Sequence, residues 1–415
     1  MELLTYLQAE FRANPMLIFG VALFFGVAGG MWANRIAWMP TITAFMLLGL
    51  LIGPNGLHLI SKPMLGQASV LIDIALGLIM YKLGTMLHPN AMIHSRRLLA
   101  LSLAETALGY IAVFAIARVM GVDVLVSALI AAISASSSPA VLVHVAEEMD
   151  AKGPVSYRAK SLVAMNNLFA FFLFTLALPF GMAGKEGASL SMVLGFPVYR
   201  LAGAVLVGIA VAWLAVRLAR HLRANDEHFR FAIVIGSVML TLGICSALSM
   251  SALFSPLVMG IAVRWFETSK HKLSQVGLGE GGDLFFIVLF VMAGAKIDLV
   301  NLWAVGLLPV VLVLCRAAGK AGGLYLAGRA HGIDNKHTAA TSMMLTPMAG
   351  MAIGLVSTTQ TMAPEISAQV ATIVFAMVAI LESIGPFLVA RALRLCDEAG
   401  KREKEADEWQ EASGT

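Results

Sequence analysis

Charged residues are scarce in this sequence. Asp, Glu, Lys and Arg make up 13% of its 415 residues, whereas soluble proteins contain about 25%. Hydrophobic residues reach 59%, and the mean hydropathy is +0.83. A chain this large with so little charge is not an ordinary soluble enzyme, and the same composition excludes a disordered or collagen-like protein. The composition predicts an integral membrane protein with many spans.

Cysteine is scarce as well. The three cysteines, Cys245, Cys315 and Cys396, are scattered through apolar stretches, which excludes a disulfide framework and predicts no metal site. The N-terminal residues lack the basic region of a signal peptide and carry Glu2 and Glu10 instead. After Arg391 the composition becomes highly charged, which predicts a short cytoplasmic tail over 391–415.

Long apolar runs are what the sequence has in abundance. Each run approaches the length of about 20 residues that a spanning helix needs, and none shows the alternation of outer-membrane strands. We therefore predict an all-α membrane protein of about thirteen spans. The predicted spans are 15–33, 40–53, 67–87, 97–117, 123–146, 157–181, 192–216, 231–248, 252–263, 283–295, 301–328, 337–361 and 367–390.

The distribution of Lys and Arg predicts the orientation. The gaps that follow odd-numbered spans, together with the tail, carry about twenty of these residues, and the opposite face carries about five. Because cytoplasmic loops are enriched in positive charge, we expect the N-terminus outside and the C-terminus in the cytoplasm of a bacterial inner membrane. The formal net charge of +4 then reflects this bias rather than a nucleic-acid surface.

A few ionisable residues lie inside the apolar runs. Arg316 and Lys320 are one helical turn apart and share a helix face. The acids Asp73, Glu105 and Glu382 also lie within spans. Because a charge at a helix centre costs about 2.5–3.5 kcal/mol on translocon scales, such residues face a protein interior or a water-filled cavity and are candidates for function.

Two spans carry helix breakers at matching positions. One contains Ser134-Ala-Ser-Ser-Ser138-Pro139 and the other Thr346-Pro347-Met-Ala-Gly350. Proline removes a backbone N–H, and Ser or Thr hydroxyls can satisfy the carbonyl that it frees. Transporters place substrate sites where such discontinuous helices meet near the bilayer midplane. We predict structural breaks at Pro139, Pro347 and Gly350, with Ser137, Ser138 and Thr346 beside the site.

Several motifs resemble those of a known transporter family. Gly49-Leu-Leu-Ile-Gly53-Pro54-Asn-Gly56-Leu57 and Phe290-Val-Met-Ala-Gly294-Ala-Lys-Ile297-Asp298 are similar to motifs of the monovalent cation:proton antiporters of the sodium/proton exchanger superfamily. Asp73 to Pro89 resembles the acid-led third helix of its potassium-efflux branch, Ser138-Pro139 resembles the family's crossover, and Lys320 falls at the family's core lysine.

The resemblance implies a fold and an activity. It implies two inverted six-helix repeats, over about 15–181 and 231–390, joined by a linker helix at about 192–216. It implies a core domain that carries the crossed helices, a second domain that forms a homodimer, and elevator-type exchange of sodium or potassium for protons without a cofactor. No nucleophile elbow, zinc-protease or nucleotide-binding motif points to an enzyme.

One departure from the family affects its ion site. The family has an aspartate on the sixth helix, where this chain has Asn166-Asn167. Asparagine cannot titrate or neutralise a cation, so Lys320 loses its family partner. Three outcomes stay open: Asp73, Glu105 or Glu382 replaces the aspartate, Lys320 itself carries the proton, or Lys320 and Arg316 bind an anionic substrate. A transport-inactive sensor of the same fold is a further alternative.

Overall fold

The computed structural model describes residues 15–33, 35, 41–54, 56–61, 65, 69–86, 95–182, 190–222, 227–252, 254–267, 273–275, 279–295 and 306–400. These residues form helices joined by turns, without a β-strand among them. The all-α prediction is therefore confirmed. The chain divides into two compact units, 1–85 with 203–304, and 86–202 with 305–415.

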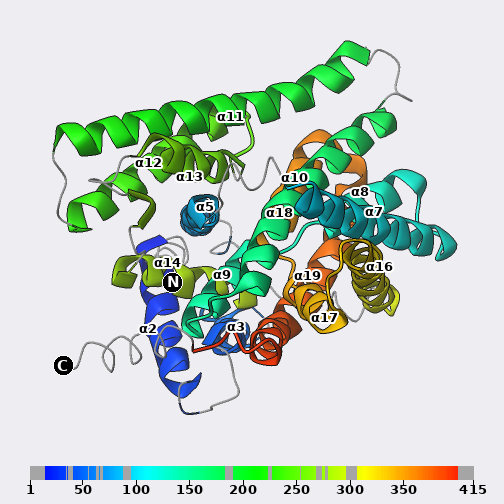
Figure 1. The fold of residues 1–415 in the computed structure, drawn as a ribbon, viewed down its shortest axis with the longest axis horizontal. Coiled ribbons are helices and arrows are strands. Elements are labelled where there is room, and N and C mark those ends of the chain that lie inside the picture. The colour runs from blue at the N-terminus through cyan, green and yellow to red at the C-terminus, as the bar shows by residue number, and fades with distance from the viewer. Residues whose placement is uncertain are drawn as a thin grey trace, which may run out of the picture. The chain divides into compact units, whose positions relative to one another are not determined.

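The first unit is built from helices of both halves of the sequence (Figure 1). It contains α2 (Pro15–Ala33), α3 (Thr41–Ile52), α5 (Ser69–Met86), most of α11 (Leu190–His221), α12 (Glu227–Ala247), α13 (Phe254–Phe266), the 3-10 turn η1 (Leu273–Gln275) and α14 (Gly279–Ala295).

A glycine sets the packing of α3 against α14 in this unit. A Cβ atom added at Gly294 would lie 2.1 Å from the carbonyl oxygen of Met46 on α3. Only glycine therefore allows the two backbones to approach this closely. Gly294 belongs to the second sequence motif that carried the family resemblance, while Ile297 and Asp298 of that motif lie outside the described residues.

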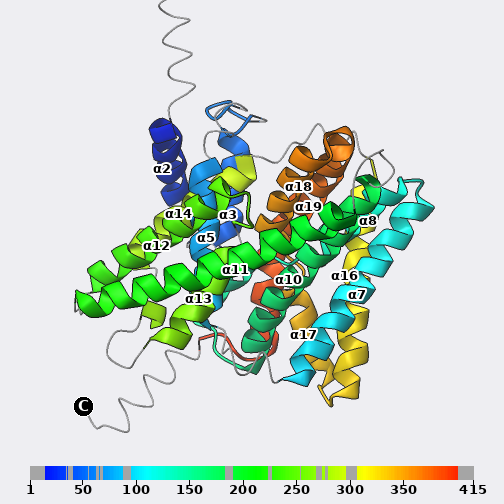
Figure 2. The ribbon, with the colours of Figure 1, turned by 90° about the horizontal axis from the view of Figure 1, so that it is seen from above.

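The second unit holds both helices that the sequence predicted to be broken. It contains α7 (Arg96–Val119), α8 (Val124–Ala135), α9 (Pro139–Glu148), α10 (Pro154–Met182), the start of α11, α16 (Leu308–Ala330), α17 (Asn335–Met344), α18 (Gly350–Met362) and α19 (Pro364–Leu395). Helices α7 and α16 run side by side in both ribbon views (Figures 1 and 2).

Each break separates two half-helices, as predicted. The first lies between α8 and α9, where Ser138 caps α9 and Pro139 occupies its first turn. The second lies between α17 and α18, which begins at Gly350. An aspartate caps the N-terminus of the helix before each break. Asp123 caps α8 and accepts from Leu125 N at 2.8 Å, and Asp334 caps α17 and accepts from Lys336 N at 2.6 Å.

Every predicted span contains helix in the described residues, and the ends agree to within a few residues where both are described. The predicted start at residue 301 lies outside the described residues, which resume at Gly306, and α16 begins at Leu308. In this part of the chain, seven helices are long and apolar enough to cross a membrane, with the α8–α9 pair taken as one. The total of thirteen spans and the two inverted repeats stay predictions. Most of the predicted tail, 401–415, lies outside the described residues.

Candidate functional site

Close packing of α7 against α16 creates the centre of the candidate site. A Cβ atom at Gly323 on α16 would lie 2.3 Å from the carbonyl oxygen of Ala104 on α7, and 2.6 Å from the Cα atom of Glu105. No larger residue fits at this position without moving the helices apart. This approach brings the Glu105 side chain to Lys320, which lies one turn before Gly323 on α16.

A buried ion pair joins the two helices. Lys320 Nζ lies 2.8 Å from Glu105 Oε2, and the two side chains are 4% and 0% exposed. Lys320 Nζ also donates to the carbonyl oxygen of Ala135, at the end of α8, at 2.7 Å. A buried charge needs a partner of opposite sign and further hydrogen bonds, and here both charges have them.

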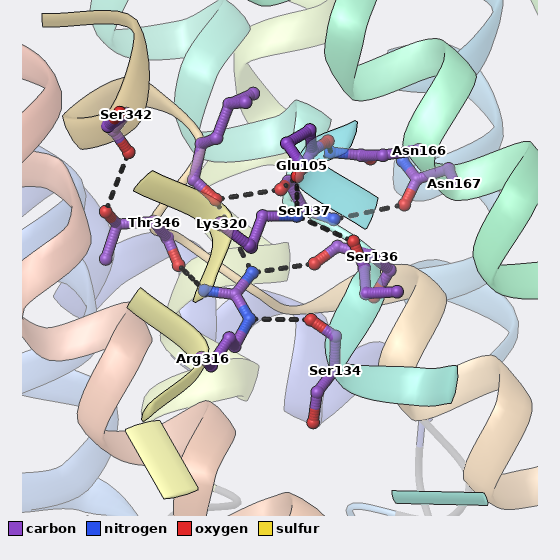
Figure 3. A network of polar contacts seen from close by, with 12 residues as sticks. Glu105, Ser134, Ser136, Ser137, Asn166, Asn167, Arg316, Lys320, Ser342 and Thr346 are labelled. Carbon is purple, nitrogen blue, oxygen red and sulfur yellow. Dashed lines mark hydrogen bonds and ion pairs between the residues drawn. The ribbon is translucent and has the colours of Figure 1, made fainter. Parts of the chain in front are cut away.

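The two asparagines of the sixth predicted span connect this pair to the first break (Figure 3). Asn166 Nδ2 donates to Glu105 Oε1 at 2.9 Å and to Ser137 Oγ at 3.0 Å. Asn167 Oδ1 accepts from the backbone N–H of Ser137 at 3.3 Å. Asn166 Oδ1 is buried without a hydrogen-bond partner among the described residues. It is therefore a neutral oxygen available to a ligand next to the Glu105 carboxylate.

The two breaks contact each other directly. Ser137 Oγ donates to the carbonyl oxygen of Leu345 at 2.8 Å, and the backbone N–H of Ser138 donates to the carbonyl oxygen of Pro347 at 2.7 Å. Segments more than 200 residues apart in sequence are thus hydrogen-bonded at their interruptions. The structure confirms that the two broken segments meet.

The Arg316 side chain binds backbone carbonyls at the C-terminal ends of α8 and α17, the helices that precede the two breaks. Its Nε donates to Ser134 O, its Nη2 to Ser136 O and its Nη1 to Thr346 O, each at 2.7 Å (Figure 3). The guanidinium group is fully buried. Because the C-terminal end of a helix carries a partial negative charge, one cation placed between two such ends compensates both.

The structure brings together seven of the eight residues that the sequence predicted for the site. The network contains Asn166, Asn167, Ser137, Ser138, Thr346, Lys320 and Arg316, and all of them except Thr346 are fully or almost fully buried. The predicted break residues Pro139, Pro347 and Gly350 flank it. Asp73 lies on α5 in the other unit, where its side chain is exposed, and its role in ion binding stays a prediction.

Glu105 was one of three acids that the sequence left open, and the contact with Lys320 now distinguishes it. A spacing signal was present on both helices. Ser102, Glu105, Thr106 and Gly109 form one face of α7, and Gly319 and Gly323 flank Lys320 on α16. Small and polar residues at this spacing are typical of closely packed membrane helices. Pairing the two faces would have predicted the ion pair.

The charges of the site are largely matched within the protein. Glu105 neutralises Lys320, and the half-helix carbonyls compensate Arg316. Two amide atoms are buried without a hydrogen-bond partner among the described residues: the oxygen Oδ1 of Asn166, an acceptor, and the nitrogen Nδ2 of Asn167, a donor. The carboxylate and amide oxygens of Glu105 and Asn166 are ligands of the kind that small hard cations prefer.

No group of three or more His, Cys, Asp or Glu side chains in the described residues is placed to hold a metal ion. Cys245 is buried and Cys315 and Cys396 are half-buried, and all three are free thiols.

Comparison with known proteins gives a family and a fold. The family described as "Sodium/hydrogen exchanger, transmembrane" matches residues 19–392. The fold is similar to two structures of the sodium proton antiporter MjNhaP1 from Methanocaldococcus jannaschii. One structure, at pH 8, is 19% identical with a TM-score of 0.68, and the match covers 92% of this chain and 95% of that one. The other, an electron-microscopy structure, is 17% identical with a TM-score of 0.69 over 91% and 94%. No curated protein sequence matches the chain.

Proposed function

Because the chain belongs to the transmembrane sodium/hydrogen exchanger family, whose members are transporters and not enzymes, we propose that it exchanges a monovalent cation, sodium or potassium, for protons. The observation that carries this proposal is the buried Glu105–Lys320 pair at the crossing of two interrupted helices. It supplies the titratable site that Asn166 and Asn167 cannot provide.

The exchange follows from competition at one carboxylate. A dehydrated cation that binds Glu105 and Asn166 Oδ1 takes the place of the Lys320 ammonium, and Lys320 gives its proton to water. When a proton returns to Lys320, the ion pair reforms and the cation leaves. The buried site then has the same net charge with either occupant, because one cation replaces one proton. Mutually exclusive occupancy of this kind couples the two fluxes.

The same contacts weigh against the alternative of an anionic substrate. An anion needs unmatched positive charge, whereas Lys320 is paired with Glu105 and Arg316 donates to carbonyls at both breaks. The family match favours the cation.

The transport cycle that we propose is elevator-type alternating access. In this cycle the unit that contains the crossing carries the ion, and the other unit forms a homodimer in the lipid bilayer. The division of the described chain into two compact units supports this assignment. The biased Lys and Arg distribution supports a bacterial inner membrane with the N-terminus outside and the C-terminus cytoplasmic.

The test uses proteoliposomes that contain a pH dye. A sodium or potassium jump across the membrane should change the internal pH, and Glu105→Gln should abolish the change. The matched control is Glu365→Gln, which removes an exposed carboxylate from the first turn of α19 and should leave the signal intact. If neither cation changes the internal pH of proteoliposomes that contain the wild-type protein, cation:proton exchange is contradicted. Normal exchange by Glu105→Gln would contradict the role of the pair.

A further inference from the structure

A second buried carboxyl group lies at the crossing and is not part of the network around Lys320. Glu382, on α19, is 1% exposed. Neither of its carboxyl oxygens has a hydrogen-bond partner among the described residues, and none of the ion pairs found there includes it. Buried acids without a partner are rare, because an ionised carboxylate away from water is strongly unfavourable.

Contacts of its neighbours on α19 place Glu382 beside the two breaks. Ser134 Oγ, at the end of α8, lies 3.9 Å from Met377 Sδ on α19. A Cβ atom at Gly385, one turn after Glu382, would lie 2.8 Å from Pro347 in the second break. The Ser138 hydroxyl, at the start of α9, lies close enough to the Glu382 carboxyl group to interact with it.

Other charged or titratable groups on the helices packed against α19 are already bound or lie farther along their helices. On α16, Lys320 contacts Glu105, and Arg316 donates to the half-helix carbonyls. Cys315, a half-buried free thiol, lies next to Arg316 on α16. The other groups lie more than one turn from the breaks: His144, Glu147 and Glu148 on α9, Lys336 and His337 on α17, and Tyr325 and Arg329 on α16.

Resting on the function proposed above, we propose that Glu382 and Ser138 form a second site that holds either a proton or a monovalent cation. The carboxyl group is neutral when protonated. A cation that displaces the proton binds the carboxylate oxygens and the Ser138 hydroxyl, and the proton passes to water. The α9 N-terminus next to Ser138 stabilises the carboxylate form because its N–H groups carry partial positive charge. Each cycle then exchanges at two carboxyl groups rather than one.

The experiment measures protons released when sodium or potassium is added to the purified protein in weakly buffered detergent solution. The background variant is Glu105→Gln with Lys320→Gln, which removes both charges of the first pair and leaves no unpaired charge there. We expect this variant to release about half as many protons as the wild type, because two titrating sites have become one. Adding Glu382→Gln should abolish the remainder, whereas adding Glu365→Gln should not.

Three results separate the proposals. Release from the wild type that is the same with and without Glu382→Gln would overturn the second site and leave the proposed function standing. No cation-dependent release from the wild type would overturn the proposed function itself. If Glu382→Gln reduces folding, Glu382→Asp is added to the same Glu105→Gln, Lys320→Gln background instead. Proton release that persists with a lower cation affinity supports the site. No proton release from this folded variant overturns it.

Discussion

Replacing Arg316 gives the sharpest test of how the crossing is held together. Its three hydrogen bonds of 2.7 Å reach Ser134 and Ser136 in one broken segment and Thr346 in the other. Arg316→Met removes all three and leaves buried carbonyls without donors. Arg316→Lys keeps the charge, but a single ammonium nitrogen cannot reproduce the spread of a guanidinium group across two segments.

The size of the effect follows from these bonds. A hydrogen bond to a charged group contributes about 1.5–3 kcal/mol, so the loss of three should cost about 4 kcal/mol or more in Arg316→Met. Arg316→Lys can retain one or two bonds and should cost about 2–4 kcal/mol. Effects this large are exceptional for single substitutions and follow only when buried polar groups lose their partners.

The assay is unfolding of the purified protein in detergent, followed by helical circular dichroism. The matched controls are Arg329→Met and Arg329→Lys, which change an exposed arginine in the last turn of the same helix and should stay within about 0.5 kcal/mol of wild type. If Arg316→Met is as stable as Arg329→Met, the guanidinium group does not hold the crossing, and the reasoning is wrong.

Three further predictions concern other contacts. Glu105→Gln and Lys320→Gln should each destabilise the protein by about 3–5 kcal/mol, and the double variant by less than either, because the charges are removed together; additive losses in the unfolding assay would contradict a functional pair. The Glu398 carboxylate accepts hydrogen bonds from Val155 N, Ser156 N and Ser156 Oγ at 2.7, 2.8 and 2.5 Å. Glu398→Ala should therefore lower the free energy of local opening at the start of α10 by about 2–4 kcal/mol. Unchanged amide hydrogen exchange at the start of α10 would refute this. Hydrogen bonds from the backbone N–H of Lys336 and from the His337 side chain lower the pKa of Asp334. The stability that Asp334 gives to α17 is therefore complete above the usual carboxyl pKa and is lost as the pH falls through the lowered pKa. Hydrogen exchange of α17 should show this loss in the wild type and not in Asp334→Asn, whose side chain does not titrate.

The fold was largely predictable because apolar length and helix breakers are local signals. Pro139 and Gly350 mark the ends of the two interruptions in the sequence itself, and each break appears where these residues predicted it. The start of α16 was predicted less closely. The apolar composition continues across Leu308, so it gives no local signal for the residue at which the helix begins.

The chemistry of the site was predictable only in part. Asn166, Asn167 and Lys320 were recognised from the family pattern, but the partner of Lys320 depends on which faces of α7 and α16 meet. That pairing is a tertiary contact set by Gly323, and a single sequence lists several acids without ranking them. The unpartnered state of Glu382 is likewise a property of its surroundings.

The bonds of Arg316 also bear on ion selectivity. Because one planar group joins carbonyls from both interrupted segments, the spacing between the two segments is fixed by the dimensions of a guanidinium fork. Contacts of this kind limit how far the two segments can move together or apart beside a bound ion. We therefore expect ionic radius to decide which alkali metal ion fits beside the crossing, and variants that loosen this frame to discriminate less between ions.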